Sequence, residues 1–226
     1  MTEVGLPDAV LWDMDGTLVD SEKLWEIGLH ELAEHLGGRL SPEARLAMVG
    51  TNVTVTMELL FADLGLELTP AAFAEADRWL EARMHELFTD EVPWQPGARE
   101  ALRMVRDTGL PTALVTSTVR SLTEGALDYI GREWFDVTVA GDEVGGENKP
   151  HPEPYLIAAG LLAVDPGRCV AIEDSPVGTA SAVAAGCSVI VVPGDVDVDP
   201  GPRLVKRESL TGLEPADLAA ALVPAG

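Results

Sequence analysis

The chain has 226 residues, of which 46% are hydrophobic, and its formal net charge is −23. This apolar content is enough to bury a sizeable core, so global disorder is excluded. The acidic balance argues against nucleic acid and anionic membranes as partners, because both are bound by clustered Lys and Arg. An anionic substrate would therefore need local positive charge, from a metal ion or a single lysine.

The stretch from Val10 to Asp20 contains a short apolar run that ends in two aspartates, Asp13 and Asp15. Such a run, cut off by Gly16, predicts a buried strand followed by a turn. Because side chains alternate along a strand, the two carboxylates are expected to lean the same way at its carboxyl end. Paired carboxylates are held together by a cation or a proton. Taken alone, the pattern is more typical of a solvated Asp-x-Asp turn, and a sugar-nucleotide glycosyltransferase would also use such a pair to hold a metal, so the rest of the chain decides between them.

Residues 21–90 show helical periodicity only. Several Ser or Thr residues stand directly before a helical stretch, two of them followed by Pro, which is typical of an N-cap and a first helical turn. This stretch therefore predicts an all-helical insertion built of antiparallel pairs. The predicted helix starts lie at Ser21, Ser41-Pro42, about Thr54 and Thr69-Pro70.

Beyond a break at 92–97 that contains two prolines, helices and strands alternate. This alternation predicts right-handed crossovers and a parallel sheet with helices on both faces, to which the first strand also belongs. An acidic segment at 195–202 is expected to be a solvated loop. The strands are predicted at 112–115, 135–140, 169–172 and 188–192, and the helices at 98–106, 119–130, 154–162, 176–185 and 213–222.

Polar groups follow the first four predicted strands. Carboxylates can hold a hard divalent cation such as Mg²⁺, while a hydroxyl and an ammonium can hold the oxygens of a phosphate. Singly, each group has a simpler explanation: Thr116 could cap the next helix, Lys149 could be solvated, and Asp174 could belong to a helix N-cap. Together they favour one crevice for a cation and a phosphate ester. These groups are Asp13 with Asp15, Thr116, Lys149 in the loop after the third strand, and Glu173 with Asp174.

Four motifs resemble the signature motifs of the haloacid dehalogenase-like hydrolase superfamily. They are Asp13-Met14-Asp15-Gly16-Thr17, Thr116, Lys149-Pro150 and Glu173-Asp174-Ser175-Pro176-Val177-Gly178. The resemblance covers residues 9–192 and points to the subgroup of β-phosphoglucomutase and the sugar-phosphate phosphatases. It implies an α/β fold with a Rossmann-like, doubly wound parallel sheet formed by residues 1–20 and 93–226. Residues 21–92 would form a small helical cap domain inserted into this core.

The resemblance also implies a Mg²⁺-dependent phosphomonoester hydrolase. Asp13 would be the nucleophile that forms an aspartyl-phosphate, and Asp15 would be the general acid and base. Mg²⁺ would be bound by Asp13, the backbone carbonyl of Asp15 and Asp174, with Glu173 either a ligand or an anchor behind the ligands. The residues implied to bind the phosphoryl group are Thr116, Ser117 and Lys149.

The superfamily encodes substrate choice in the cap, mainly in its first helix and in the turn around Gly50. In this chain we expect Trp25, Gly50 and Asn52 to contact the substrate. Trp25 also lies on an apolar stripe with Leu29 and Leu32, so packing alone could explain it. Sugar-phosphate phosphatases of this subgroup often carry an aromatic residue there, which favours a sugar or polyol phosphate.

Two other activities of the same fold are less compatible with the motifs. A haloalkanoate dehalogenase lacks a second aspartate at the position of Asp15 and needs no Mg²⁺. A non-catalytic binding or regulatory module of this fold usually loses a motif residue, whereas this chain retains all of them.

A phosphomutase is the closest alternative to a phosphatase. It must bind a second phosphate in the cap, which requires basic groups there. The positions that match the basic cap residues of β-phosphoglucomutases are Trp25, Val49 and Val53, and residues 46–73 contain no Lys, Arg or His. Arg45 could substitute from a neighbouring turn. We expect a phosphatase.

Cys169 and Cys187 are the only cysteines and lie in apolar, strand-like contexts, which is typical of reduced core residues in a cytoplasmic protein. The segment from Met1 to Val4 has no feature of a signal peptide. No apolar stretch reaches the roughly 18 residues of a membrane span. We expect a cytoplasmic protein, with a monomer as the default oligomeric state.

Overall fold

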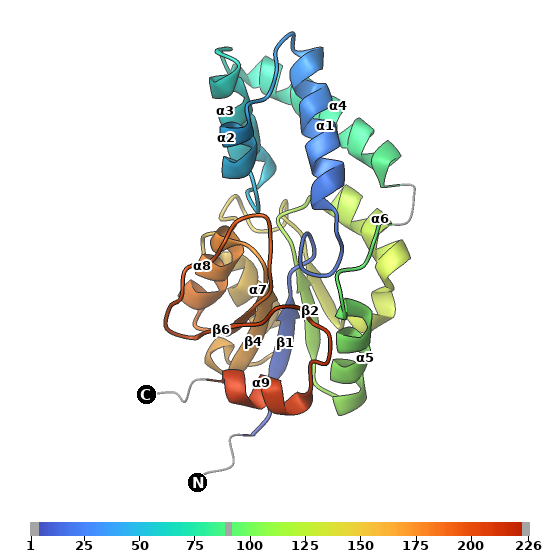
Figure 1. The fold of residues 1–226 in the computed structure, drawn as a ribbon, viewed down its shortest axis with the longest axis vertical. Helices are drawn as coiled ribbons and strands as arrows, with labels where there is room; N and C mark the ends of the chain where they lie inside the picture. Colours follow the sequence, from blue (N-terminus) through green and yellow to red (C-terminus); the bar gives the residue numbers. More distant parts are fainter. Residues whose placement is uncertain (1–4, 89–91, 223–226) are drawn as a thin grey trace.

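The computed structural model describes residues 5–88 and 92–222, which form a six-stranded parallel sheet with helices on both faces and a helical layer above one edge (Figure 1). The strand order is β3-β2-β1-β4-β5-β6, so the first strand of the chain lies in the middle of the sheet. The predicted parallel sheet is confirmed. The strands are β1 (Ala9–Trp12), β2 (Thr112–Val115), β3 (Val137–Val139), β4 (Cys169–Glu173), β5 (Ser188–Val191) and β6 (Leu204–Lys206).

Alternating side chains of β1 reach two separate hydrophobic clusters. Val10 and Trp12 pack with residues of α5, α6 and α9 on one face, whereas Ala9 and Leu11 pack with residues of α7 and α8 on the other. All four are fully buried, because a doubly wound sheet covers both faces of its central strands. The core helices are α5 (Ala98–Thr108), α6 (Arg120–Ile130), α7 (Glu153–Leu161), α8 (Pro176–Ala185) and α9 (Pro215–Ala221), with short 3₁₀ turns η1 (Arg132–Trp134) and η2 (Pro166–Arg168).

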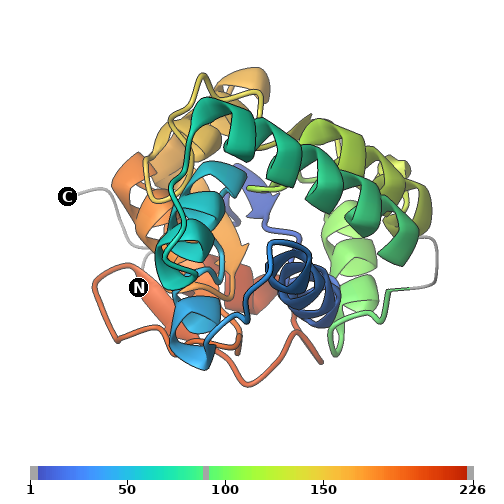
Figure 2. The same ribbon diagram turned by 90° about the horizontal axis from the view of Figure 1, so that it is seen from above.

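The helical layer, called the cap below, is arranged around the carboxyl end of β1 when seen from above (Figure 2). It has its own hydrophobic cluster, in which Leu32, Leu60 and Met84 are buried, and Leu122 of α6 extends this cluster into the core. The side chains of Ser41, Asn52 and Thr69 accept hydrogen bonds from the backbone at the starts of their helices. The cap helices are α1 (Glu22–His35), α2 (Pro42–Ala47), α3 (Val53–Asp63) and α4 (Pro70–Leu87).

The two ends of the cap meet at one point on the core. Val19 and Trp94 form an antiparallel bridge, and the backbone N–H of Asp20 donates to the carbonyl of Pro93 at 2.7 Å. These bonds lie at the two predicted junctions between cap and core. We propose that the core domain comprises residues 1–20 and 93–226 and that the cap domain comprises residues 21–92.

Three features differ from expectation. Ser21 precedes α1 as predicted, but its hydroxyl makes no capping bond and donates to Asp15 instead. The acidic loop 195–202 is not wholly solvated, because Val198 is buried against the core. Strand β6 was not predicted, since it has only three residues and Val205 is exposed.

Both cysteines are buried and unpaired, as predicted, and burial raises the pKa of each thiol to about 12. Among the described helices, none is both long and apolar enough to cross a membrane. Residues 1–4, on which the signal-peptide expectation depends, lie outside the described residues. The last part of the predicted helical stretch, at 89–90, lies outside them as well.

Candidate active site

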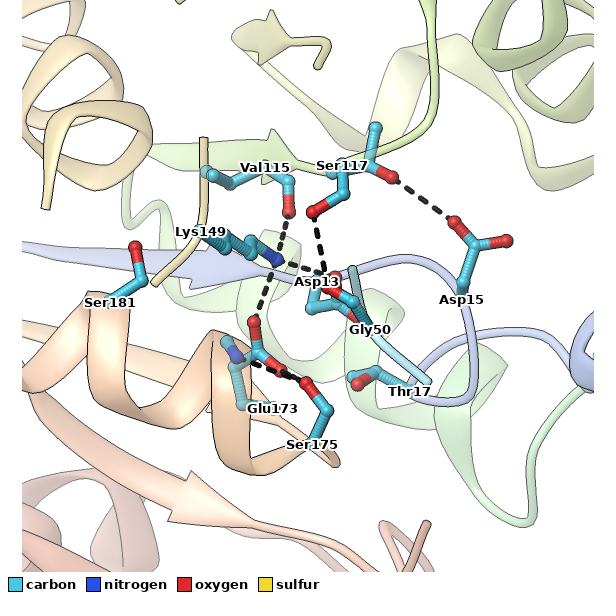
Figure 3. A network of polar contacts seen from close by, with 12 residues as sticks. Asp13, Asp15, Thr17, Gly50, Val115, Ser117, Lys149, Glu173, Ser175 and Ser181 are labelled. Atoms are coloured by element: carbon cyan, nitrogen blue, oxygen red, sulfur yellow. Dashed lines mark hydrogen bonds and ion pairs between the residues drawn. The ribbon is translucent and has the colours of Figure 1, made fainter. Parts of the chain in front are cut away.

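The sheet brings the polar groups of distant segments to one edge. Trp12 at the end of β1 pairs with Leu114 of β2 on one side and with Ile172 of β4 on the other. Residues that follow these three strands therefore lie side by side, although long stretches of sequence separate them. The predicted crevice at the carboxyl ends of the strands is where the structure places the motif residues (Figure 3).

Lys149 connects the groups of this crevice. Its Nζ donates to Asp13 Oδ1 at 2.7 Å, to Glu173 Oε1 at 2.7 Å and to the carbonyl of Val115 at 2.9 Å, and only 3% of the residue is exposed. Burial alone would lower the pKa of Lys149, but the charges of Asp13 and Glu173 outweigh burial and raise it. The ammonium is therefore held charged and desolvated at the centre of the site, which excludes the solvated-surface alternative.

Glu173 serves as the support for this lysine. Its Oε1 also accepts a hydrogen bond from the hydroxyl of Tyr155 at 2.7 Å, and its Oε2 accepts bonds from the backbone N–H of Asp174 and the hydroxyl of Ser175. Both oxygens are thus already engaged. Of the two predicted roles, this position favours an anchor over a direct metal ligand.

Two carboxylate oxygens of the site have no protein partner. Asp13 Oδ2 and Asp174 Oδ2 are buried without a hydrogen bond, and one ligand atom each of Asp13, Glu173 and Asp174 lie within 4.8 Å of one another. Burial first, and then the nearby Glu173, raise the pKa of Asp13 to about 8; burial and the charge of Asp13 raise the pKa of Asp174 well above its usual range. Such a set of unsatisfied hard oxygens fits a divalent cation such as Mg²⁺.

Asp15 lies apart from this cluster and accepts bonds from both domains. On the cap side, its Oδ1 is 2.6 Å from the Ser21 hydroxyl and 3.2 Å from Trp25 Nε1. On the core side, its Oδ2 is 3.1 Å from the Thr116 hydroxyl and 2.8 Å from the Thr118 hydroxyl. The carboxylate is therefore fixed in place by four hydrogen bonds. Figure 3 shows it directed away from Lys149.

A cavity lies between the cap and the core, directly over these groups. Its empty volume, which includes space open to solvent, is about 840 Å³. Both aspartates of the first motif and Lys149 line its core side, together with Ser117. Trp25 and Gly50, which we expect to contact the substrate, line its cap side.

Two predicted residues are placed differently from expectation. The side-chain oxygen of Asn52 accepts bonds from the backbone of Thr54 and Val55, and so caps α3, while Thr51 and Val53 line the cavity in its place. The hydroxyl of Thr116 faces Asp15 and accepts a bond from the backbone N–H of Thr118, so it does not cap the next helix. It is not among the described residues that line the cavity.

The turn at Gly50 touches the core. Its backbone has a φ of +71°, which favours glycine, and a Cβ added there would lie 2.8 Å from Ser175 Oγ. The hydroxyl of Ser117 also donates to the Gly50 carbonyl at 3.5 Å. Glycine is therefore required at this position both by the turn and by the close approach of cap to core.

Sequence reasoning missed three residues of the site. The sequence predicts Ser21 as a helix cap and assigns no role to Thr118, yet both bind Asp15. No sequence signal marks Tyr155, whose contact with Glu173 spans 18 positions and depends on how α7 packs against the sheet.

A model of the haloacid dehalogenase-like hydrolases matches residues 7–186. The chain belongs to this family, which confirms the resemblance seen in the motifs. Hydrolases of this family generally use a divalent metal, and the carboxylate group around Asp13 is compatible with one.

Two relatives and one solved structure are similar to this chain over most of its length. Hexitol phosphatase B of Escherichia coli (strain K12) is 33% identical over 216 residues, which cover 93% of this chain and 96% of that protein. A phosphorylated carbohydrates phosphatase of Thermotoga maritima is 32% identical over 187 residues, covering 79% and 82%. A crystal structure of a CbbY variant from Rhodobacter sphaeroides, in complex with xylulose-(1,5)bisphosphate, superposes with a TM-score of 0.80 at 29% identity, covering 92% and 96%.

Proposed function

We propose that this protein is a Mg²⁺-dependent phosphatase that hydrolyses the monoester of a small phosphorylated metabolite, a sugar or polyol phosphate. The observation that carries the proposal is the arrangement of Asp13, in which Oδ1 is held by Lys149 while Oδ2 is buried and free of hydrogen bonds. Lys149 thereby fixes the orientation of the carboxylate, and its second oxygen has no partner among the described residues. The names of the relatives, hexitol and carbohydrate phosphatases, support the substrate class.

In the first step, the Asp13 carboxylate attacks phosphorus, and the bond from phosphorus to the substrate alcohol breaks. Asp15, which enters this step protonated, gives its proton to the departing alkoxide. In the second step, a water molecule attacks the aspartyl-phosphate, gives its proton to Asp15 and releases inorganic phosphate together with the free Asp13 carboxylate. Splitting the displacement in this way returns both aspartates to their starting states.

The remaining residues orient the reacting groups or offset the negative charge of the phosphoryl group. Lys149 offsets the negative charge of the phosphoryl oxygens in a desolvated site, where such an interaction is strong. Ser117 lines the same cavity and would help to bind the phosphoryl group. Thr116 contributes through Asp15, whose orientation it fixes. Mg²⁺, bound by Asp13, Asp174 and the backbone carbonyl of Asp15, would neutralise charge on the phosphoryl group. All these residues come from one chain, so we propose that a monomer suffices.

The cap geometry disfavours the phosphomutase alternative. Arg45, the cation that could have bound a second phosphate, is buried and donates to Glu22 Oε2 at 2.7 Å. It does not line the cavity, whereas Glu22 does. A second phosphate would therefore meet a carboxylate where a mutase needs a cation.

The proposal is tested by incubating the protein with Mg²⁺ and a panel of phosphorylated metabolites, and by measuring release of inorganic phosphate. We expect turnover by the native protein and none by Asp13→Asn, whose amide cannot attack phosphorus. The variant should keep its thermal stability, because it removes one of several mutually repelling buried carboxylates. Undiminished turnover by Asp13→Asn would refute the mechanism. If the protein converted β-glucose 1-phosphate to glucose 6-phosphate faster than it released phosphate, the proposed function would be that of a mutase and not of a phosphatase.

A further inference from the structure

The wall of the cavity has an uneven distribution of charge. At its core end lies the buried Asp13, the proposed nucleophile, whose position fixes where the phosphoryl group reacts. Among the described residues that line the cavity, Lys149 is the sole cation, and it belongs to this core end. The charged lining residues are Asp13, Asp15, Lys149, Glu22, Asp77 and Glu81.

Three of these carboxylates lie on the cap, where the leaving group of a phosphate ester must lie. Glu22 is compensated, because Arg45 binds it from behind at 2.7 Å. Burial raises the pKa of Glu22, and the bond with Arg45 offsets part of that rise. The other two carboxylates, Asp77 and Glu81, come from α4 and have no such arginine or lysine partner within the described residues.

Asp77 and Glu81 are neighbours on one face of α4, one helical turn apart. Glu81 Oε1 accepts a hydrogen bond from the hydroxyl of Ser121 at 2.5 Å, and the half-exposed His85 lies 4.0 Å away. Asp77 has neither a hydrogen bond nor an ion pair in the part of the chain that the structure describes. Partial burial and the charge of Glu81 both raise the pKa of Asp77, as expected for a carboxylate that faces a cavity without a cation.

We propose that Asp77 and Glu81 make this protein select phosphate monoesters whose leaving alcohol is uncharged, against esters that carry a second anionic group. The inference rests on the proposed phosphatase function and defines its substrate class. A carboxylate or second phosphate in the cap half of the cavity would meet like charges at a reduced dielectric constant. Hydroxyl groups of a polyol would instead donate hydrogen bonds to the same carboxylates.

This selectivity would set the protein apart from some members of its family. The structure of the CbbY variant contains a bisphosphate. An ester of that kind has a second phosphate to place in the cap half of the cavity, where this chain presents Asp77 and Glu81. We therefore expect a bisphosphate to be a poor substrate here.

The test compares esters that differ only in charge. Sorbitol 6-phosphate and 6-phosphogluconate differ in one terminal group, an alcohol or a carboxylate, and glycerol 3-phosphate and 3-phosphoglycerate form a shorter pair of the same kind. We expect kcat/KM to favour the neutral member by about tenfold or more. The preference should shrink as ionic strength rises, because salt screens the repulsion.

The variants assign this preference to the two carboxylates. The double variant Asp77→Asn, Glu81→Gln should raise kcat/KM for the anionic esters and reduce the preference about fivefold or more. The glutamine amide that replaces the carboxylate of Glu81 can still accept the bond from Ser121. Glu75→Gln is the matched control: it removes one charge from the same helix, at an exposed position outside the cavity, and should leave the preference unchanged.

The outcomes separate the two proposals. Hydrolysis of both members of a pair at equal efficiency, or an unchanged preference in the double variant, would overturn the selectivity while leaving the phosphatase intact. Hydrolysis of the anionic members alone would also overturn the selectivity and would leave the phosphatase function intact. Release of phosphate from no ester of the panel would overturn the proposed function and this inference with it.

Discussion

The indole N–H of Trp25 donates to Asp15 Oδ1 at 3.2 Å, so a residue of the first cap helix holds the proposed acid and base of the core. The ring also packs edge-on against Phe88, with 6.4 Å between the ring centroids. Trp25 thus packs within the cap and also lines the cavity, while its contact with a substrate stays a prediction.

Replacing Trp25 by Phe separates these two roles. The phenyl ring retains the packing against Phe88 but cannot donate to Asp15, so we expect kcat to fall about tenfold because Asp15 loses one of the bonds that orient it. Tm should fall by only roughly 1–6 °C, since a typical hydrogen bond contributes about 0.5–1.5 kcal/mol. Steady-state kinetics and thermal unfolding check both parts. Trp79→Phe is the control, because Trp79 stacks on His35 within the cap and does not line the cavity. A Trp25→Phe variant with native kcat would show that the indole only packs.

Lys149→Met should lower kcat/KM at least a hundredfold, or about 2.7 kcal/mol, because no other cation lines the described cavity. It should also lower stability by roughly 3–5 kcal/mol, since Glu173 would be left buried without a counter-charge. Adding Glu173→Gln should restore most of the stability without restoring activity. Lys206→Met, at an exposed edge-strand position, should change neither. A loss below about tenfold would remove Lys149 from the catalytic machinery.

Binding of Mg²⁺ should be visible in stability as well as in activity. At about 100 times its dissociation constant the ion would add about 2.7 kcal/mol, which corresponds to a rise in Tm of roughly 5–11 °C for a protein of this size. Asp174→Asn should abolish most of this rise and stabilise the metal-free protein, because one of three crowded carboxylates loses its charge. Asp197→Asn, on an exposed loop, should keep the full rise. Equal shifts in both variants would place the ion elsewhere.

Gly50→Ala should raise KM several-fold, because the added methyl group would collide with Ser175 and hold the cap away from the core. Gly37→Ala provides a close control: its φ is +84°, so the backbone strain is similar, but a Cβ there meets no atom within 4 Å. Both variants should lose a comparable amount of stability. If their kinetic constants changed equally, strain in the turn and not contact with the core would be the cause.

The sheet could be predicted because its central strands are apolar on both faces and end abruptly in polar residues. Residues 169–172 contain no polar side chain except the buried thiol of Cys169, which is typical of a strand covered on both sides. Strand β6 could not be predicted in this way. Its register with β5 depends on tertiary position, and its own three residues carry no burial pattern.

The identity of the site residues could also be predicted, but their bonds could not. Position at a strand end indicates that Thr116 lies in the crevice, whereas its rotamer decides whether the hydroxyl faces a phosphate or Asp15. Asn52 shows the same limit, since its side chain could serve either the cavity or its own helix. Long-range contacts such as that between Tyr155 and Glu173 leave no local pattern, because the packing of whole elements creates them.

The bridge between Val19 and Trp94 has a consequence for how such proteins diversify. Because the chain leaves the core and returns to it at adjacent points, the segment between them contributes nothing to the strand order of the sheet. A helical block of another sequence joined at the same two points would meet an unchanged nucleophile and lysine. Recombination at these junctions would exchange specificity in a single event, while the reacting groups are inherited intact on the core.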